Sequence, residues 1–332
     1  MRAVVWDKPG RLQIADTPDP APGHGQLVVQ VSVCGICGTD VHIADGDFPP
    51  TPYPIIPGHE FSGRIVARGD GVPGDWQEGR RVAVDPSLFC GYCPACRAGR
   101  GNLCANWGAI GDTVDGAFAE YVAVPFANAY LIPDSVDDRQ GALIEPLSCA
   151  VHALRLIGPV LGERVLIVGA GTMGLLLMQL ILRSGAASVT VVDRKSARLE
   201  VAATLGASTV ADDMAAIDGR RFAVSVDATG APAAIEAAFA SLGRGGRLLI
   251  FGVADADASV SLSPFRIYND EVTVLGSMAV LHSFGEAMGL IAGGAIDTAP
   301  LLGQPASLDQ FPEALARVRS GDGIKVQVAP GR

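Results

Sequence analysis

The residue types best suited to chemistry occur within nine positions, from Cys34 to His42, where the chain reads Cys-Gly-Ile-Cys-Gly-Thr-Asp-Val-His. A thiolate at Cys37 is a good zinc ligand, and the two glycines in this stretch let the backbone bend tightly. We therefore expect a short turn after Cys37 that brings a hydroxyl, a carboxylate and an imidazole together. In such a turn, the hydroxyl of Thr39 is placed to pass on a proton.

The other two zinc-ligand types follow at His59 and Glu60, directly after a Pro-Gly pair. With Cys37 they would make a three-ligand site, and a three-ligand zinc site keeps one position open for catalysis. Cys34 and Cys37 could instead be a redox dithiol or two packing cysteines. However, a thioredoxin-like site needs a helix after the strand, and the strand-like residues 26–33 are followed by a turn sequence. The pattern therefore favours a metal site.

A second cluster of metal ligands consists of four cysteines within fifteen residues. Their spacings suit one tetrahedral zinc, and a set made only of thiolates is typical of a closed, structural site. Four cysteines without a metal would leave a glycine-rich lobe with no core to hold it. An iron–sulfur cluster is the other alternative, but no proline follows the fourth cysteine as it does in ferredoxin runs. The four residues are Cys90, Cys93, Cys96 and Cys104.

Length and composition indicate two domains and exclude some partners. The chain has 332 residues, of which 49% are hydrophobic, and this is too long for one ordinary domain. A net charge of −10 argues against nucleic acids and anionic membranes as partners. Because no stretch is typical of a membrane span or a signal peptide, we expect a cytoplasmic protein. Seven cysteines, an odd number, fit a reducing compartment better than a disulfide framework.

The first domain is predicted to begin with residues 1–147 and to be a small β-barrel. Its short alternating runs are separated by proline and glycine, which is typical of such barrels. The four-cysteine lobe lies within it, at residues 88–106. Two helical runs and a short apolar run beyond Ser283 are expected to return to this domain, which then includes residues 284–332. Residues 148–283 form the predicted second domain.

Glu145 stands where the sequence changes from β-rich to helical. Pro146 follows it, and proline is favoured at the first position of a helix, so a helix that links the domains is expected directly after Glu145. The carboxylate could stabilise the start of this helix electrostatically, or it could bind zinc. Its position alone does not decide between the two roles.

The second domain opens with a dinucleotide-binding pattern. A strand at 164–168 leads into Gly169, Gly171 and Gly174 in a Gly-x-Gly-x-x-Gly turn, and a helical run, a second strand and Asp193 follow. The first glycine permits the tight turn, the second lets the backbone approach a pyrophosphate, and the third lets the helix pack on the sheet. Asp193 can accept hydrogen bonds from ribose hydroxyls and would repel a 2′-phosphate, which favours NAD. Its neighbour Arg194 weakens that preference.

Further alternation of strands and helices predicts a doubly wound parallel sheet. Thr229, Gly230, Gly252 and Val253 follow two of its strands, where such sheets bind ligands. A last apolar strand at 271–276 either closes the sheet or pairs with another subunit.

The order of these motifs resembles the zinc-dependent medium-chain alcohol dehydrogenase family along almost the whole chain. The Glu-Pro-Leu sequence at Glu145 is similar to the branch of sorbitol, threonine and other polyol dehydrogenases. The resemblance implies a GroES-like barrel as catalytic domain and a Rossmann domain. It also implies two zinc ions: a catalytic one on Cys37 and His59, with Glu60 and Glu145 as competing further ligands, and a structural one on the four-cysteine lobe.

The same resemblance implies roles for the neighbouring residues. Thr39 and His42 match the proton relay, and Asp40 matches a carboxylate that orients a zinc ligand. Met173 and Val253 match positions that flank the nicotinamide, and Arg198 matches a contact to the adenosine ribose. The expected cofactor-binding residues are Gly169, Gly171, Thr172, Met173, Gly174, Asp193, Arg194, Arg198, Thr229, Gly252 and Val253.

The expected activity is hydride transfer between NAD(H) and the carbinol carbon of a polyol, cyclitol or other secondary alcohol. No Lys or Arg occurs between Asp40 and Phe61, which disfavours a phosphorylated or carboxylate substrate. Sorbitol dehydrogenases carry an arginine shortly after the last strand, and residues 276–280 here contain none. The alternatives are an NADPH-dependent ketone or aldehyde reductase and a non-catalytic dinucleotide-binding protein. A homodimer or homotetramer is expected.

Overall fold

The computed structural model describes residues 1–48 and 50–331 as two compact units. One unit contains residues 1–148 and 280–332, and the other contains residues 149–279. The boundary falls within helix α4 (Ile144–Ile157). Within the described residues, no helix is both long and apolar enough to cross a membrane.

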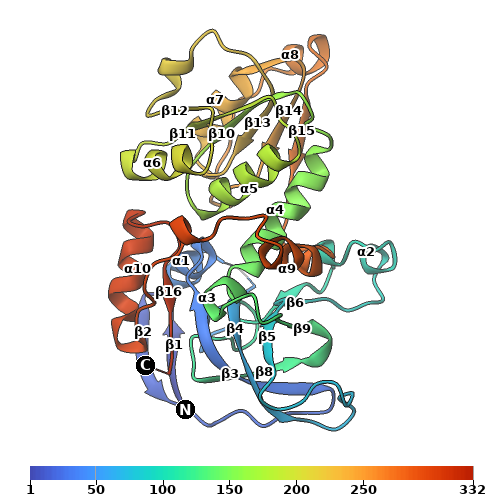
Figure 1. Cartoon of the computed structure of the whole chain (residues 1–332), viewed down its shortest axis with the longest axis vertical. Coiled ribbons are helices and arrows are strands. Elements are labelled where there is room, and N and C mark those ends of the chain that lie inside the picture. The colour runs from blue at the N-terminus through green and yellow to red at the C-terminus, as the bar shows by residue number, and fades with distance from the viewer. Residues whose placement is uncertain (49, 332) are drawn as a thin grey trace. The chain divides into compact units, whose positions relative to one another are not determined.

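The first unit is built around an antiparallel sheet in the order β16-β3-β4-β5-β9, and β8 also pairs with β3 (Figure 1). The longest strand, β3, exposes Gln30 but buries Leu27, Val29 and Val31, so one of its faces lies on the core. The strands are β3 (Gln26–Gly35), β4 (Glu60–Arg68), β5 (Arg81–Val84), β8 (Tyr121–Pro125), β9 (Ala129–Leu131) and β16 (Gln327–Val328). Outside this sheet, β1 (Arg2–Lys8) pairs with β2 (Arg11–Asp16), and β6 (Ser87–Leu88) pairs with β7 (Gly108–Ala109).

The C-terminal segment packs into this first unit. Helix α10 (Phe311–Ser320) begins with Phe311, whose ring lies 4.7 Å from that of Phe118 in the core. Strand β16 then pairs with the end of β3, with Gln327 opposite Gly35. The other helices of this unit are α1 (Gly38–Asp45), α2 (Pro94–Arg97), α3 (Asp138–Gly141) and α9 (Phe284–Ala292). Short 3-10 segments are η1 (Gly101–Leu103), η2 (Phe126–Asn128), η4 (Ala299–Leu301) and η5 (Leu308–Gln310).

The segment after Cys37 was expected to be a turn, and this prediction was wrong because α1 begins there. Cys37 is the N-cap residue, and the carboxylate of Asp40 accepts a hydrogen bond from the backbone N–H of Cys37 at 2.8 Å. An acidic residue at the third helical position satisfies the N-cap backbone in this way and stabilises the first turn. The helix then ends at Gly46 in the left-handed conformation.

The second unit contains the predicted doubly wound parallel sheet, with the strand order β12-β11-β10-β13-β14-β15. The chain starts in the middle at β10, moves outward through β11 and β12, and then crosses to β13 on the other side of β10, which is the Rossmann arrangement. The strands are β10 (Arg164–Val168), β11 (Ser188–Val192), β12 (Thr209–Ala211), β13 (Phe222–Asp227), β14 (Leu242–Ile250) and β15 (Thr273–Gly276). Between them lie α5 (Thr172–Arg183), α6 (Ser196–Thr204), η3 (Met214–Ile217), α7 (Pro232–Ala240) and α8 (Pro264–Asn269).

Candidate active site and dinucleotide-binding loops

Cys37, His59 and Glu60 meet where two neighbouring strands of the first unit begin or end. Gly35 at the end of β3 is paired with Glu60 at the start of β4, so the residue before β4 and the residues after β3 become neighbours. One potential ligand atom from each of the three residues lies within 4.8 Å of those of the other two. His59 and Glu60 are buried, and Cys37 is partly exposed. The three side chains therefore form a sulfur, nitrogen and oxygen donor set with one accessible side.

The absence of a side chain at Gly35 makes room for the carboxylate of Glu60. A Cβ atom at position 35 would lie 2.2 Å from Oε2 of Glu60. Because this distance is far below van der Waals contact, any larger residue would displace the carboxylate. The glycine that the sequence suggested as a bend residue is thus needed for close approach.

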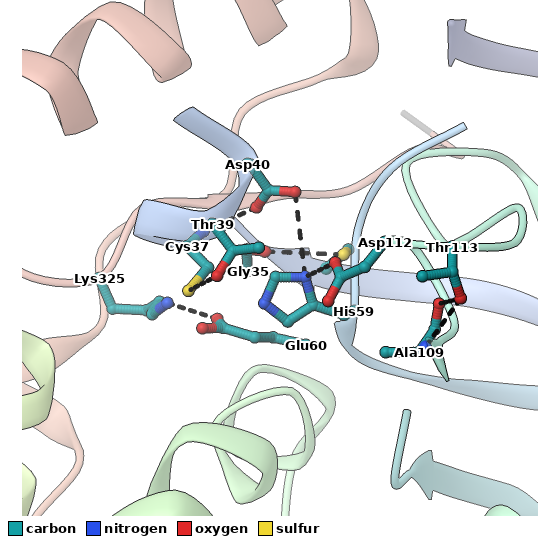
Figure 2. Close-up of polar contacts among 11 residues, drawn as sticks. Gly35, Cys37, Thr39, Asp40, His59, Glu60, Ala109, Asp112, Thr113 and Lys325 are labelled. Carbon is teal, nitrogen blue, oxygen red and sulfur yellow. Dashed lines mark hydrogen bonds and ion pairs between the residues drawn. The ribbon is translucent and has the colours of Figure 1, made fainter. Parts of the chain in front are cut away.

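Asp112, which sequence reasoning missed, lies behind His59. Its Oδ1 atom is 3.1 Å from Nδ1 of His59, whereas Oδ1 of Asp40 is 4.0 Å from the same nitrogen. Figure 2 shows the His59 ring between Asp112 on one side and Cys37 and Glu60 on the other. The second ring nitrogen is therefore the one available to a metal, and Asp112 fixes this orientation.

Three glycines bring the Asp112 turn against the segment that precedes β4 and contains His59. A Cβ atom at Gly111 would lie 2.4 Å from the carbonyl oxygen of Gly58, and one at Gly116 would lie 2.4 Å from both that oxygen and Cα of Gly111. In each case the added Cβ atom would meet backbone atoms, so no movement of a neighbouring side chain could relieve the overlap. No local pattern in the sequence pairs Asp112 with His59; only the spacing of glycines around it gives a weak signal.

The buried charges at this site influence one another's pKa values. Burial raises the pKa of Asp40 to about 7, against the favourable hydrogen bond from the backbone of Cys37. Burial lowers the pKa of His59, but the Asp112 carboxylate and Cys37 both raise it, and together they leave the pKa well above the ordinary value. An acidic partner of this kind increases the basicity of an imidazole ligand.

Lys325 is the second residue that sequence reasoning missed. Its ammonium group donates hydrogen bonds to Oε2 of Glu60 and, at 3.0 Å, to the carbonyl oxygen of Ile36. Burial lowers the pKa of Lys325, but the charges of Glu60 and Cys37 raise it, and the result is above the usual range. In the sequence, Lys325 stands out only as a lysine between two apolar residues, and this pattern does not reveal that Glu60 is its partner.

The remaining predicted residues of this site lie on α1 and α4. The Oγ1 atom of Thr39 is 3.8 Å from Sγ of Cys37, and His42 follows one turn later on the same helix and is half-buried. Glu145 lies in the first turn of α4 rather than before the helix, and it is 8% exposed. It is outside the set of three ligand residues, although its charge raises the pKa of Lys325.

The four cysteines of the lobe form a second compact donor set. Their sulfur atoms all lie within 4.8 Å of one another, with Cys90 and Cys104 at 3.5 Å and Cys93 and Cys104 at 3.9 Å. A tetrahedral zinc with Zn–S bonds of about 2.3 Å requires sulfur separations of about 3.8 Å. The backbone N–H groups of Cys93 and Cys96 point at the sulfurs of Cys90 and Cys93, at 3.4 and 3.5 Å. These donors stabilise thiolates, and all seven cysteines of the chain are free.

In the second unit, the glycine-rich loop between β10 and α5 has the geometry that its sequence predicts. Gly169 has a φ of +106°, which favours glycine, and Gly171 is the N-cap residue of α5. A Cβ atom at Gly174 would lie 1.9 Å from the carbonyl oxygen of Gly169, so helix and loop touch. Thr172 and Met173 form the first turn of α5, at the end of the helix that attracts anions.

Asp193 follows strand β11 and faces this loop. Its carboxylate accepts hydrogen bonds from the backbone N–H groups of Ala170, at 2.7 Å, and Lys195, at 2.8 Å. Arg198 on α6 lies 3.9 Å from the same carboxylate, and Arg194 follows Asp193 in the chain. The predicted ribose-binding acid is therefore held beside the glycine-rich loop.

The loops after β13 and β14 lie against each other. A Cβ atom at Gly230 would be 2.0 Å from the carbonyl oxygen of Val253, and one at Gly252 would be 2.1 Å from the backbone nitrogen of Gly230. The hydroxyl of Thr229 donates to the buried carboxylate of Asp227 at 2.6 Å. Val253 is 67% exposed, so it is available for contact with a ligand.

Comparison with known proteins decides the family. Residues 23–134 match the alcohol dehydrogenase GroES-like domain, and residues 172–293 match the zinc-binding dehydrogenase domain. D-arabinitol dehydrogenase 1 of Uromyces fabae is 34% identical, with 99% of this chain and 97% of that protein covered. The L-threonine 3-dehydrogenase of Shewanella loihica is 32% identical, with 98% of each chain covered. The chain belongs to the zinc-dependent medium-chain alcohol dehydrogenase family.

A solved member of this medium-chain alcohol dehydrogenase family has nearly the same structure. It is a zinc-binding dehydrogenase from Sinorhizobium meliloti 1021 bound to NADP, with a TM-score of 0.94, 36% identity and 99% of each chain covered. The predicted combination of a GroES-like domain with a Rossmann domain is thereby confirmed. As a medium-chain alcohol dehydrogenase of the polyol and threonine dehydrogenase branch, the protein is an oxidoreductase that acts on secondary alcohols.

Proposed function

We propose that the protein is an NAD(H)-dependent dehydrogenase of polyols or similar secondary alcohols, with a catalytic zinc on Cys37 and His59 and a structural zinc on the cysteine lobe. The observation that carries this proposal is the convergence of Cys37, His59 and Glu60 within 4.8 Å, with Asp112 behind the imidazole. Buried imidazole and carboxylate groups beside a partly exposed sulfur are what a zinc site with an open position needs.

Zinc fits both donor sets by their chemistry. Nδ1 of His59 and Oδ1 of Asp112 lie 3.1 Å apart, and neither atom has a further hydrogen-bond partner among the described residues. This is expected of a carboxylate that orients a metal-binding imidazole. A zinc ion bound here would supply a Lewis acid that polarises the oxygen of the substrate and favours loss of its proton. Cys37, His59 and one of Glu60 and Glu145 would hold it.

The residues of α1 would manage the proton of the substrate hydroxyl. Thr39 lies beside the sulfur of Cys37, so its hydroxyl is at the edge of the proposed metal site. His42 is only half-buried, so its imidazole can exchange a proton with water. Thr39 would accept the proton of the substrate hydroxyl while its own hydroxyl proton passes on toward His42, which would release it to water.

The cofactor would bind to the second unit through the glycine-rich loop and Asp193. The N-terminus of α5 would face the pyrophosphate, and Asp193 would accept hydrogen bonds from the adenosine ribose, with Arg198 and Arg194 beside it. Thr229, Gly252 and Val253, at the ends of β13 and β14, would line the nicotinamide side together with Met173. The negative charge of Asp193 favours NAD over NADP.

A reductase that uses NADPH is the second candidate, and one observation favours it. The Sinorhizobium meliloti relative is bound to NADP, and Arg194 and Lys195 could both attract a 2′-phosphate. Comparison of kcat/KM with NAD and with NADP decides between the candidates. A ratio that favours NADP by tenfold or more would overturn the role given to Asp193.

The substrate class is proposed from the relatives and from the charge of the site. The relatives named above include dehydrogenases of D-arabinitol and of L-threonine. Asp45 on α1 makes a bidentate ion pair with Arg319 on α10, at 2.6 and 2.7 Å, so its carboxylate is already paired and is not assigned to the substrate. A screen of NAD reduction with C3 to C7 polyols, cyclitols, simple secondary alcohols and L-threonine tests the proposal; activity on none of them would refute it.

We also propose that the protein is a homo-oligomer of a reducing compartment such as the cytoplasm. Strand β15 is an edge strand of the parallel sheet, and it carries the exposed Val274, with Met278 exposed shortly after it. Phe265 and Tyr268 on α8 are also exposed. An edge strand with exposed apolar residues on it and near it favours pairing with a second copy. Light scattering of the purified protein distinguishes a monomer, a dimer and a tetramer.

A further inference from the structure

A buried lysine, Lys325, contacts Glu60, which is one of the three potential metal ligands. The side chain of Lys325 is 4% exposed and that of Glu60 is 1% exposed, and the two form an ion pair (Figure 2). Burying an ammonium group is costly unless it is paired and hydrogen-bonded, so Lys325 needs a specific reason to be there. Its carbonyl partner at Ile36 and its carboxylate partner at Glu60 together fix the position of the ammonium group.

The fold holds Lys325 at this place through the backbone. The N–H group of Ile36 donates to the carbonyl oxygen of Val326 at 2.9 Å, and the N–H group of Lys325 donates to that of Leu301 at 3.1 Å. Strand β16 follows directly and pairs with the end of β3. The C-terminal segment is therefore attached to the strand that precedes Cys37, and Lys325 cannot move away without breaking this pairing.

Glu60 has two competing electrostatic partners. One of its oxygens belongs to the set that could hold a metal with Cys37 and His59, and its Oε2 accepts a hydrogen bond from Lys325. A carboxylate that neutralises an ammonium group is a weaker ligand, because part of its negative charge is already compensated. The same ammonium group adds one positive charge to a site that contains the acidic groups of Cys37, Glu60 and Glu145.

We propose that Lys325 is a positioning residue that competes with the metal ion for the carboxylate of Glu60 and so keeps Glu60 from becoming a permanent ligand. This inference rests on the proposed metal site at Cys37 and His59. In the native protein the coordination position that Glu60 would otherwise take stays available to substrate, since Glu60 is held by Lys325. If the ammonium group is removed, the metal ion is the cation that remains for the buried carboxylate of Glu60. Glu60 then occupies a coordination position on the metal.

The test is Lys325→Met, measured as Co²⁺ affinity by competition with a chelator and by the visible absorption of bound Co²⁺. The absorption of a Cys37→Ala variant is subtracted, so that the spectrum reports only the site that depends on Cys37. We expect Lys325→Met to bind Co²⁺ at least about tenfold more tightly, a gain of ~1.4 kcal/mol. We also expect the absorption bands to change, since an added ligand alters the coordination.

The double variant Lys325→Met with Glu60→Gln separates positioning from simple repulsion between two cations. Repulsion alone predicts the same gain in affinity whether position 60 is Glu or Gln. Competition for Glu60 predicts a gain of less than about threefold in the Glu60→Gln background and no spectral change there. Equal gains in both backgrounds would overturn the inference while leaving the proposed function intact. No Cys37-dependent Co²⁺ site at all would overturn both.

A second probe keeps every charge. In Gly35→Ala the new methyl group would lie 2.2 Å from Oε2 of Glu60, so it pushes the carboxylate away from its present position beside Lys325. The displaced carboxylate no longer lies beside Lys325, so we expect the visible absorption of bound Co²⁺ to change, and an unchanged spectrum would count against the inference. If Lys325→Met does not fold, Lys325→Gln, which also removes the ammonium group, takes its place and should show the same gain in affinity. Lys325→Arg, which retains the cation, should stay within about threefold of the native affinity, and a tenfold gain there would contradict the inference.

Discussion

The Oδ1 atom of Asp112 lies 3.1 Å from Nδ1 of His59, closer than the carboxylate of Asp40 at 4.0 Å. Both partners are buried, so little solvent screens the contact. The carboxylate nearest to the imidazole thus comes from a loop about fifty positions away in the sequence, and not from helix α1, which follows Cys37 and carries Asp40.

Asp112→Ala should weaken metal binding at the site of Cys37 and His59. The loss of an outer partner of a histidine ligand generally reduces metal affinity by about 10–100-fold. Asp112→Asn, which keeps an oxygen acceptor, should have a smaller effect. Chelator competition measures the change, and the cysteine lobe is the internal control because its affinity should not move. Native affinity in Asp112→Ala would show that Asp40 orients His59 instead.

Cys93→Ser should remove the metal of the lobe and destabilise the fold. Three thiolates and a hydroxyl hold zinc more weakly, and the lobe has little other core. We expect metal content to fall by one ion per chain and the thermal midpoint to decrease, while the folded fraction retains its kcat. The control is Cys149→Ser, because Cys149 lies outside both donor sets. Unchanged metal content in Cys93→Ser would contradict a structural zinc.

Gly116→Ala should destabilise the first unit and loosen the contact of Asp112 with His59. The added methyl group would collide with backbone atoms of Gly58 and Gly111, and overpacking of this kind costs about 1–3 kcal/mol. Denaturant unfolding measures the free energy. Gly74→Ala is the matched control, since a Cβ atom there has no neighbour within 4 Å. Equal stabilities for the two variants would mean that the glycine contact is not needed.

Asp193→Asn should shift the cofactor preference toward NADP. The substitution keeps the size of the side chain but removes the negative charge that would repel a 2′-phosphate. We expect the ratio of kcat/KM for NADP to that for NAD to rise at least about tenfold, which corresponds to ~1.4 kcal/mol. A general loss of folded enzyme lowers both values equally, so the ratio is its own control. An unchanged ratio would assign the choice of cofactor to other residues.

The sequence predicted those parts of the protein that depend on local spacing. The glycine-rich loop, Asp193 and the four cysteines lie within short segments, so their geometry follows from the local backbone and from a few side chains. The alternation of strands and helices likewise predicted the parallel sheet, because each unit of strand and helix is a local structure with a fixed handedness. The helix after Cys37 was missed, since glycine, threonine and aspartate occur both in turns and at the start of helices.

The tertiary structure alone decided which distant charges meet at the proposed metal site. Asp112 reaches His59 because three glycines let two backbones touch, and Lys325 reaches Glu60 because β16 pairs with the end of β3. Neither contact leaves a periodic pattern in the chain, because it depends on how two remote segments pack. The amino-acid types therefore indicated which chemistry the site could perform, and the packing of the first unit determined which neighbouring groups control it.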